Sequence, residues 1–318
     1  MSWNNAHEAL RKLENAKLPH WENYYGFYNS WLGGYFREPW AALLPLDDHG
    51  FHRGDAVFEA GRIYHRAFFD LGSHLKRLQT SARAIGMELP KSLDEIEAIC
   101  VKLAQLCNVD HGALRLYVSR GPGSFSPSPS DVIGHQIYAA ITKLKPPSDT
   151  AYESGVRAMF STIPAKEPFW SQIKSCNYLQ NVLMKQECNK KGVDYAICLN
   201  EQEELCEGST ENMMIITQDL HLIVPKFDYT LSGTTVMQVM KIAEASGKVK
   251  SVSFGNLHRE DLKRAREAAL VGTTLAVLPL TEIEGTKIGS GKAGEICRWL
   301  NGELLSKMRD DETLRTKF

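Results

Sequence analysis

Strand-like and helix-like segments alternate along the second half of the chain, and this order restricts the fold more than any other feature. Short apolar runs are separated by longer stretches whose apolar residues recur at helical spacing. The expected strands cover residues 156–162, 194–199, 213–217, 222–224 and 275–279, and the expected helices cover residues 178–191, 235–245, 259–269 and 293–307. The pattern predicts an α/β domain.

The first half of the chain predicts a separate, smaller domain. Strands are expected at residues 56–64, 113–119 and 133–144, helices at 69–87 and 93–106, and a hairpin within the aromatic stretch 21–40 that turns at Gly33-Gly34. The polar, proline-bearing segment 145–149 is the best boundary candidate. We therefore predict an N-terminal helical extension over residues 1–23, a small α/β domain over 24–145 and a large domain over 146–318.

Charge and cysteine content narrow the class of protein. A formal net charge of −1 over 318 residues offers no field that would attract nucleic acid or an anionic membrane. The first residues are polar and charged, and no apolar run is long enough to span a bilayer. The seven cysteines include no C-x-x-C pair, which fits reduced thiols better than disulfides or a zinc site. We expect a cytoplasmic protein without a metal.

One glycine motif matches a nucleotide-binding pattern but lacks its context. Residues 289–294 read G-x-G-x-x-G, yet they follow no clear strand of a βαβ unit and precede no acidic partner strand. The segment also departs from the P-loop pattern at Thr286 and Ala293. We interpret it as a tight turn that opens the last helix.

Three other signals are individually weak. Lys174 stands at an expected helix start after an aromatic segment, where a lysine is more often a solvated charge than a reactive amine. Glu207-Gly208 has the composition of an acidic turn. Gly233-Thr234-Thr235 opens an expected helix, whose free N–H groups and dipole favour an anion.

The order and spacing of these signals resemble the class IV aminotransferases, the fold-type IV family of pyridoxal phosphate (PLP) enzymes. The resemblance extends from about residue 51 to 299 and is most specific over residues 173–243. It rests there on three motifs, which are Lys174-x-x-Asn177, Glu207-Gly208-x-x-x-Asn212 and Leu231-x-Gly233-x-Thr235. It implies two α/β domains, with the cofactor at the domain interface, and a homodimer.

The resemblance also implies a role for each matching residue. Lys174 would form the Schiff base with PLP and move the proton between the substrate Cα and the cofactor C4′. Glu207 would pair with the pyridine nitrogen, and Tyr178 would hydrogen-bond the phenolate oxygen. The phosphate would be bound by four residues, Arg77, Thr234, Thr235 and Thr273.

The resemblance implies that the substrates are an amino acid and a 2-oxo acid, with the amino acid branched-chain-like or of the D series. The loop after residue 119 keeps Arg120 but lacks the Arg-x-His of the D-amino acid branch, and Val236 replaces a family arginine. Arg53 stands where branched-chain members carry a tyrosine that faces the substrate, and it could bind a carboxylate. Arg53, Phe58 and Arg120 are the candidate substrate residues.

Two alternatives to a transaminase remain open from the sequence. One is an aminodeoxychorismate lyase, although Ala60 stands where that branch has a catalytic threonine. The other is a catalytically silent relative that serves as a binding protein, although such a relative would have lost Lys174 or Glu207.

Overall fold

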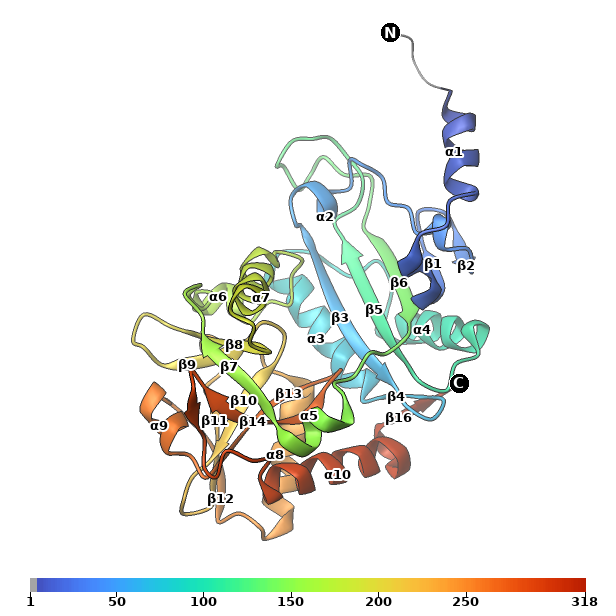
Figure 1. Ribbon diagram of the computed structural model, residues 1–318. Coiled ribbons are helices and arrows are strands. Elements are labelled where there is room, and N and C mark those ends of the chain that lie inside the picture. Colours follow the sequence, from blue (N-terminus) through green and yellow to red (C-terminus); the bar gives the residue numbers. More distant parts are fainter. Residues whose placement is uncertain (1–4) are drawn as a thin grey trace. The chain divides into compact units, whose positions relative to one another are not determined.

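The computed structural model describes residues 5–318, so the first four residues of the predicted N-terminal extension lie outside the described part. The chain forms two compact units, Met1–Leu144 together with Thr316–Phe318, and Lys145–Arg315. Each unit has its own β-sheet (Figure 1). The predicted mixed α/β class is confirmed, and within the described residues no helix is both long and apolar enough to cross a bilayer.

The first unit is built on a seven-stranded sheet in the order β16-β4-β3-β5-β6-β1-β2. Its strands are β1 (Tyr24–Asn29), β2 (Gly34–Phe36), β3 (Ala56–Ile63), β4 (Ala67–Phe69), β5 (Gly112–Ser119), β6 (Gln136–Thr142) and β16 (Arg315–Lys317), and its helices are α1 (Ala6–Glu14), α2 (His49–His52), α3 (Leu71–Ala84) and α4 (Leu93–Cys107), with short 3-10 turns η1 (Pro19–Asn23) and η2 (Pro39–Ala41). The expected hairpin is present, since β1 and β2 pair antiparallel.

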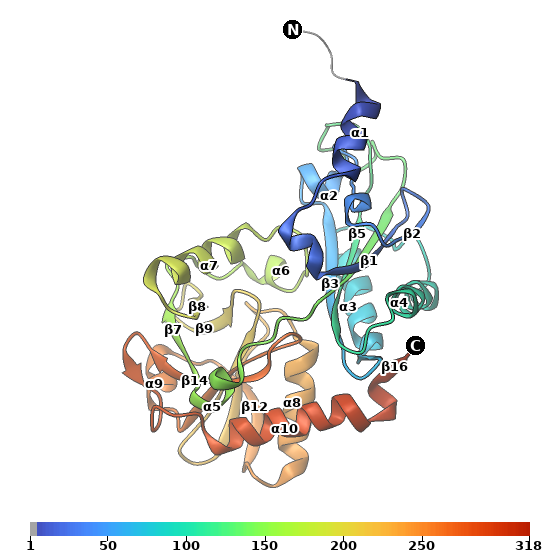
Figure 2. The ribbon, with the colours of Figure 1, turned by 45° about the vertical axis from the view of Figure 1, so that its right-hand side comes forward.

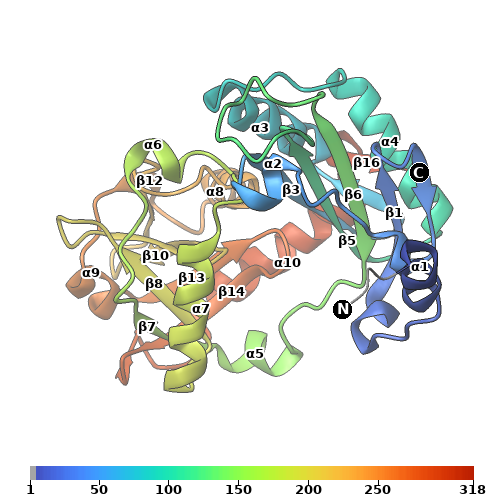
Figure 3. The same cartoon turned by 90° about the horizontal axis from the view of Figure 1, so that it is seen from above.

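Helices α3 and α4 lie on the same face of this sheet (Figures 2 and 3). Helix α4 begins with a capping box, in which Ser92 and Glu95 satisfy each other's backbone N–H groups. Its buried face carries Ile96, Ile99 and Leu103 at helical spacing. This apolar stripe is the reason that the segment folds as a helix against the sheet.

The second unit is built on a nine-stranded mixed sheet in the order β12-β11-β10-β13-β14-β7-β8-β9, with β15 beside β14. Its strands are β7 (Val156–Phe160), β8 (Tyr195–Leu199), β9 (Leu205–Gly208), β10 (Asn212–Ile216), β11 (His221–Pro225), β12 (Ser251–Gly255), β13 (Glu267–Gly272), β14 (Ala276–Ile283) and β15 (Thr286–Lys287), and its helices are α5 (Asp149–Ser154), α6 (Pro168–Ser171), α7 (Leu179–Lys191), α8 (Thr234–Ser246), α9 (Arg259–Arg264) and α10 (Glu295–Asp310), followed by the 3-10 turn η3 (Glu312–Leu314).

Strand β8 separates two apolar layers of this unit. Its residues alternate, so that Ile197 lies in the large core while Ala196 and Cys198 face Met184 and Cys188 of α7. Helices α8 and α10 contact each other and the central strands β13 and β14 (Figure 2). The alternation therefore fixes α7 beside β8 and β9, and these elements carry the candidate site.

The structure corrects one predicted element. The helix expected over residues 259–269 ends at Arg264, and Glu267–Gly272 is strand β13, which pairs antiparallel with β10 and β14. The run Ala268–Leu270 contains no glycine or proline, and its apolar residues fit the spacing of a helix. Burial on both faces of the sheet overrides that local preference, because the run is fully apolar.

Candidate active site

Lys174 lies in the loop between α6 and α7 rather than at a helix start. Its neighbours Ile173 and Ser175 are only 4% and 5% exposed, so the backbone on both sides of the lysine is fixed by burial. The preceding helix α6 begins at Pro168, and its Ser171 hydroxyl donates to the carbonyl of Asp228 at 3.1 Å. These contacts hold the loop, and the half-buried Lys174 lines a cavity.

Glu207 lies in strand β9, where the sequence suggested a turn. The turn follows it at Ser209-Thr210, while Gly208 still pairs with Ile197 of β8. The Glu207 carboxylate accepts a hydrogen bond from the backbone N–H of Leu231 at 3.0 Å. Burial raises the pKa of Glu207 to about 7, although this hydrogen bond and the nearby charges of Lys166 and Lys174 act to lower it.

The backbone of Leu231 joins this carboxylate to the start of α8. Its N–H bonds to Glu207, and its carbonyl accepts from the Asn212 side-chain amide at 2.9 Å. Two residues later Gly233 is the N-cap of the helix, and it has no side chain that could accept from the first N–H groups. A Cβ on Gly233 would lie 1.9 Å from Asn212 Oδ1, so only glycine lets these segments meet this closely.

The start of α8 has the features of an anion site. Thr234 and Thr235 occupy its first turn, and the Thr235 hydroxyl lies 3.4 Å from that of Thr273 in the turn between β13 and β14. The N-terminus of this thirteen-residue helix, with hydroxyl groups beside it, can hold a phosphate through N–H and O–H donors. The structure thus brings the three predicted threonines into one region.

Lys174, Tyr178 and Glu207 line one small cavity of about 40 Å³. Its other lining residues are Lys166, Ser171, Ile173, Asn181, Ser209, Thr210, Glu211, Asn212 and Leu231. The Asn181 amide nitrogen donates to the Ser209 carbonyl at 2.6 Å, but its Oδ1 is buried and has no hydrogen-bond partner within residues 5–318. A buried acceptor of this kind is satisfied when a polar ligand enters, which fits a cofactor with several polar substituents.

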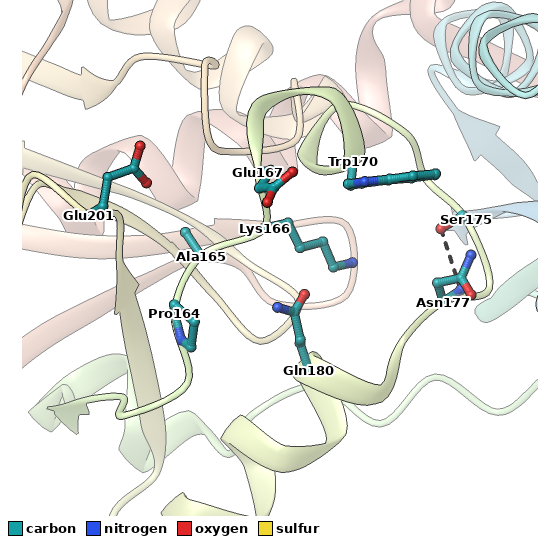
Figure 4. A pocket seen from close by; sticks show the side chains of 9 residues that line it. All are labelled: Pro164, Ala165, Lys166, Glu167, Trp170, Ser175, Asn177, Gln180 and Glu201. Atoms are coloured by element: carbon teal, nitrogen blue, oxygen red, sulfur yellow. Dashed lines mark hydrogen bonds between the residues drawn. The ribbon is translucent and has the colours of Figure 1, made fainter.

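A larger cavity of about 620 Å³ adjoins Lys166, which sequence reasoning did not identify (Figure 4). It is lined by Pro164, Ala165, Lys166, Glu167, Trp170, Ser175, Asn177, Gln180 and Glu201. Lys166 lies eight residues before Lys174 in a polar loop between two prolines, a context that carries no sequence signal. Only the fold places it beside Lys174 and Glu207.

Arg77 belongs to the first unit and is bound to a buried carboxylate. Its Nε and one terminal nitrogen donate to Glu59 at 2.7 and 2.8 Å, and His74 contacts the same carboxylate at 2.7 Å. Burial alone would raise the pKa of Glu59, but the charge and hydrogen bonds of Arg77, followed by those of His74, hold it at about 2. Strand β3 and helix α3 therefore fix the Arg77 guanidinium.

The three candidate substrate residues also lie in the first unit, in different settings. Arg53 is exposed and donates to the carbonyls of His52 and Phe125, and Phe58 stacks on Tyr117 with ring centroids 5.8 Å apart. Arg120 is buried, and four hydrogen bonds join it to Asp55 and to the carbonyls of Ile85 and Gly86. These contacts favour a structural role for Arg120, while a substrate role for Arg53 and Phe58 stays a prediction.

Comparison with known sequences finds aminotransferases. Residues 56–283 match the family model described as amino-transferase class IV. A chloroplastic D-amino-acid transaminase of Arabidopsis thaliana is 32% identical over 316 residues, which cover 97% of this chain and 83% of that protein. A D-alanine aminotransferase of Bacillus licheniformis is 29% identical, over 90% of this chain and 98% of its own length.

Solved structures support the fold. A branched-chain amino acid aminotransferase solved with pyridoxamine 5'-phosphate superposes with a TM-score of 0.86, covering 92% of this chain and 98% of that one at 24% identity. The Escherichia coli branched-chain enzyme gives a TM-score of 0.84 at the same identity, covering 93% and 99%. Among residues 5–318, no cluster of three or more His, Cys, Asp or Glu side chains could hold a metal ion.

Proposed function

The chain belongs to the class IV aminotransferase family and is a PLP-dependent transaminase, and we propose that Lys174 and Glu207 are its two principal cofactor residues. The observation that carries this assignment is that both side chains line one cavity, with Glu207 joined through Leu231 to the start of α8. Nothing in this site favours the lyase or the silent alternative.

Each residue has a defined task in amino transfer. When bound, PLP supplies an aldehyde that accepts an amine and a conjugated ring that withdraws electrons from the attached carbon. The Lys174 amine would hold the cofactor through that aldehyde, and the same amine is placed to give a proton to, and take one from, the substrate Cα. The Glu207 carboxylate would pair with the protonated pyridine nitrogen, whose charge favours electron withdrawal by the ring.

The remaining family residues orient the cofactor in this proposal. The N–H groups at the start of α8, with Thr234, Thr235 and Thr273, bind the phosphate, and the Arg77 guanidinium adds a charge-assisted bond. Tyr178, which lines the cavity of Lys174, donates to the phenolate oxygen.

For the amino donor, we propose a D-amino acid, with a 2-oxo acid as acceptor. Two relatives that align with at least 90% of this chain are named D-amino-acid transaminase and D-alanine aminotransferase. The Lys174-x-x-Asn177 spacing agrees with that branch. The runner-up is a branched-chain amino acid, because a relative from Methanocaldococcus jannaschii at 29% identity is named a putative branched-chain-amino-acid aminotransferase.

The cofactor assignment can be tested by labelling. Protein purified with PLP should absorb in the visible, and borohydride should fix the cofactor on the peptide that contains Lys174. Lys174→Ala should remove the label, whereas Lys190→Ala, which changes an exposed lysine of α7, should keep it. Label on another lysine, or no uptake of PLP, would refute the assignment.

The donor can be tested with single half-reactions. D- and L-alanine and D- and L-leucine are added one at a time without an acceptor, and the change in the bound-cofactor spectrum is followed. We expect the D enantiomers to react faster. A reaction confined to L-leucine would support the branched-chain reading instead.

The assembly and the compartment are part of the proposal as well. A homodimer is supported by the exposed apolar side chains Phe169, Trp170, Leu179 and Val182 on α6 and α7. Cytoplasmic location is supported by the seven cysteines, none of which forms a disulfide in the described part of the chain. Light scattering after gel filtration measures the molar mass in solution and tests the homodimer.

A further inference from the structure

A second lysine, Lys166, lines the cavity of Lys174 and Glu207, and the proposed function gives it no task. It is the residue that the 40 Å³ cavity and the 620 Å³ cavity have in common. Its side chain extends into the larger cavity between Trp170 and Gln180 (Figure 4). Lys166 therefore stands where the larger cavity meets the groups proposed to bind the cofactor.

The Lys166 ammonium contacts an aromatic ring. Its Nζ lies 5.2 Å from the centroid of the Tyr178 ring, a cation–π distance. Burial lowers the pKa of Lys166, while the proximity of Glu207 and Cys198 acts in the opposite direction. The carboxylates of Glu167 and Glu201 line the larger cavity with it, and Glu201 accepts from the Tyr229 hydroxyl at 2.6 Å.

Glu207 has few groups that favour its ionised form. The backbone N–H of Leu231 is its hydrogen-bond donor, Lys166 and Lys174 supply positive charge, and Glu211 supplies negative charge. Glu211 itself is buried and accepts from the backbone and hydroxyl of Thr210. The two lysines therefore have to offset both the burial of Glu207 and the adjacent carboxyl group.

The two lysines differ in whether their charge persists. In the proposed function, the Lys174 nitrogen binds the cofactor and then gives and takes a proton, so its charge changes during turnover. Lys166 has no such task, and its contact with Tyr178 leaves the ammonium in place. Its charge thus does not depend on the proton transfers assigned to Lys174.

We propose that Lys166 is a positioning residue, a second cation that favours the ionised form of Glu207 and holds the Tyr178 ring in place while Lys174 changes its charge. This role rests on the proposed function of Glu207 and extends it to a residue outside the three family motifs. The rival role is a direct bond from Lys166 to the substrate carboxylate.

The first test uses cofactor-free protein, so it does not depend on catalysis. The Glu207 carboxyl resonance is followed by carbon NMR in protein labelled at glutamate, and Glu207→Gln assigns it by its loss. In Lys166→Met and Lys166→Gln the carboxyl pKa should rise by about one unit, because an adjacent opposite charge is removed. Lys166→Arg should restore it, and Lys190→Met should leave it unchanged.

The second test separates the two roles kinetically in the PLP-loaded enzyme. If Lys166 acts through Glu207, the neutral variants lower kcat and shift the acidic limb of the pH profile upward, while KM for the amino acid changes by less than about twofold. Lys166→Arg then recovers most of the activity. A rise in KM of about tenfold with an unmoved Glu207 resonance would show instead that Lys166 binds substrate, and would overturn the proposal.

Failure of this proposal is distinguishable from failure of the proposed function. A carboxyl shift in protein that takes up no PLP would refute the cofactor assignment and leave the effect of Lys166 standing. An active PLP enzyme whose Glu207 resonance is the same in all Lys166 variants would refute the role of Lys166 and leave the cofactor assignment standing.

Discussion

At the scale of the residue, the role proposed for Glu207 requires an ionised carboxylate, in a position where burial makes ionisation costly. Its pKa of about 7 lies well above the ordinary value of 4.5 because of burial. The folded protein therefore binds a proton there more tightly than the unfolded chain. Ionisation of Glu207 destabilises the folded protein, so the free energy of unfolding falls as the pH rises from about 4.5 to 7.

Glu207→Gln should remove that cost. The glutamine carbonyl can still accept the Leu231 N–H, so the local structure should persist. In cofactor-free protein the stability advantage of the variant over the wild type should grow as the pH is raised from about 5 to 8, by at most about 3 kcal/mol. Urea titrations of both proteins at about pH 5 and about pH 8 measure this change. A stability difference that does not change with pH would contradict the prediction.

The transaminase activity of the same variant should fall about 100-fold or more.

The residues that the sequence identifies in this site are those with a motif. Lys174, Glu207 and the threonines of α8 belong to motifs whose spacing resembles that of the family, and in our proposal each of them contacts the cofactor. Lys166 has no such spacing, because its relation to Glu207 arises from the packing of separate loops. A sequence pattern can therefore reveal the groups expected to touch the cofactor, but not the charges that surround them.

At the scale of the element, strand β3 and helix α3 are joined by the Glu59, His74 and Arg77 cluster. Glu59→Gln would remove the buried negative charge that Arg77 and His74 share, and we expect the free energy of unfolding to fall by about 3 kcal/mol at pH 7. The pKa of Glu59 is depressed to about 2, so its stabilisation is complete above about pH 4.5 and is lost as the pH falls toward 2. Denaturation curves at about pH 7 and about pH 3 test this.

The control for this prediction is Glu88→Gln, which changes an exposed carboxylate of the same unit. It should alter stability by less than about 0.5 kcal/mol at either pH. Equal effects of the two variants would mean that the buried cluster does not stabilise the contact between β3 and α3.

The start of α8 makes a second element-scale prediction. Gly233→Ala would bring a Cβ to within 1.9 Å of Asn212 Oδ1, so the helix start or Asn212 must shift. We expect a loss of about 1–3 kcal/mol and roughly tenfold or more weaker binding of PLP, measured by equilibrium dialysis. Gly302→Ala, in the middle of α10 with open space around it, should instead gain about 0.5–1 kcal/mol. Unchanged PLP affinity in Gly233→Ala would contradict the proposed phosphate site.

Elements are predictable from sequence where one face is apolar and the other polar. Helix α4 meets that condition, and both its ends agree with the prediction to within one residue. The segment that becomes β13 does not, since its residues 268–271 are apolar on both faces of the strand and lie at the centre of a sheet. Local spacing cannot separate a buried strand from a buried helix there, because the partner strands that decide it lie far away in the chain.

At the scale of the whole molecule, the chain returns to its first unit at the C-terminus, which no sequence pattern predicted. Strand β16 joins the edge of the first sheet beside β4. The Phe318 ring lies 5.4 Å from that of the fully buried Phe68, and the Arg66 guanidinium lies 5.9 Å from the Phe318 ring. The terminal residues thus complete a sheet whose other strands end at Thr142.

Removal of residues 316–318 should therefore destabilise the first unit selectively. The edge pairing and the aromatic contact together are expected to contribute about 2 kcal/mol. Hydrogen exchange should accelerate in β3 and β4 while the amides of β10 and β13 keep their protection. Removal of residues 1–14 is the matched control, because α1 buries no residue and its loss should leave both sheets unchanged. Faster exchange throughout both sheets would mean that the two units unfold together, and the C-terminal strand would then stabilise the molecule as one cooperative unit rather than its first sheet alone.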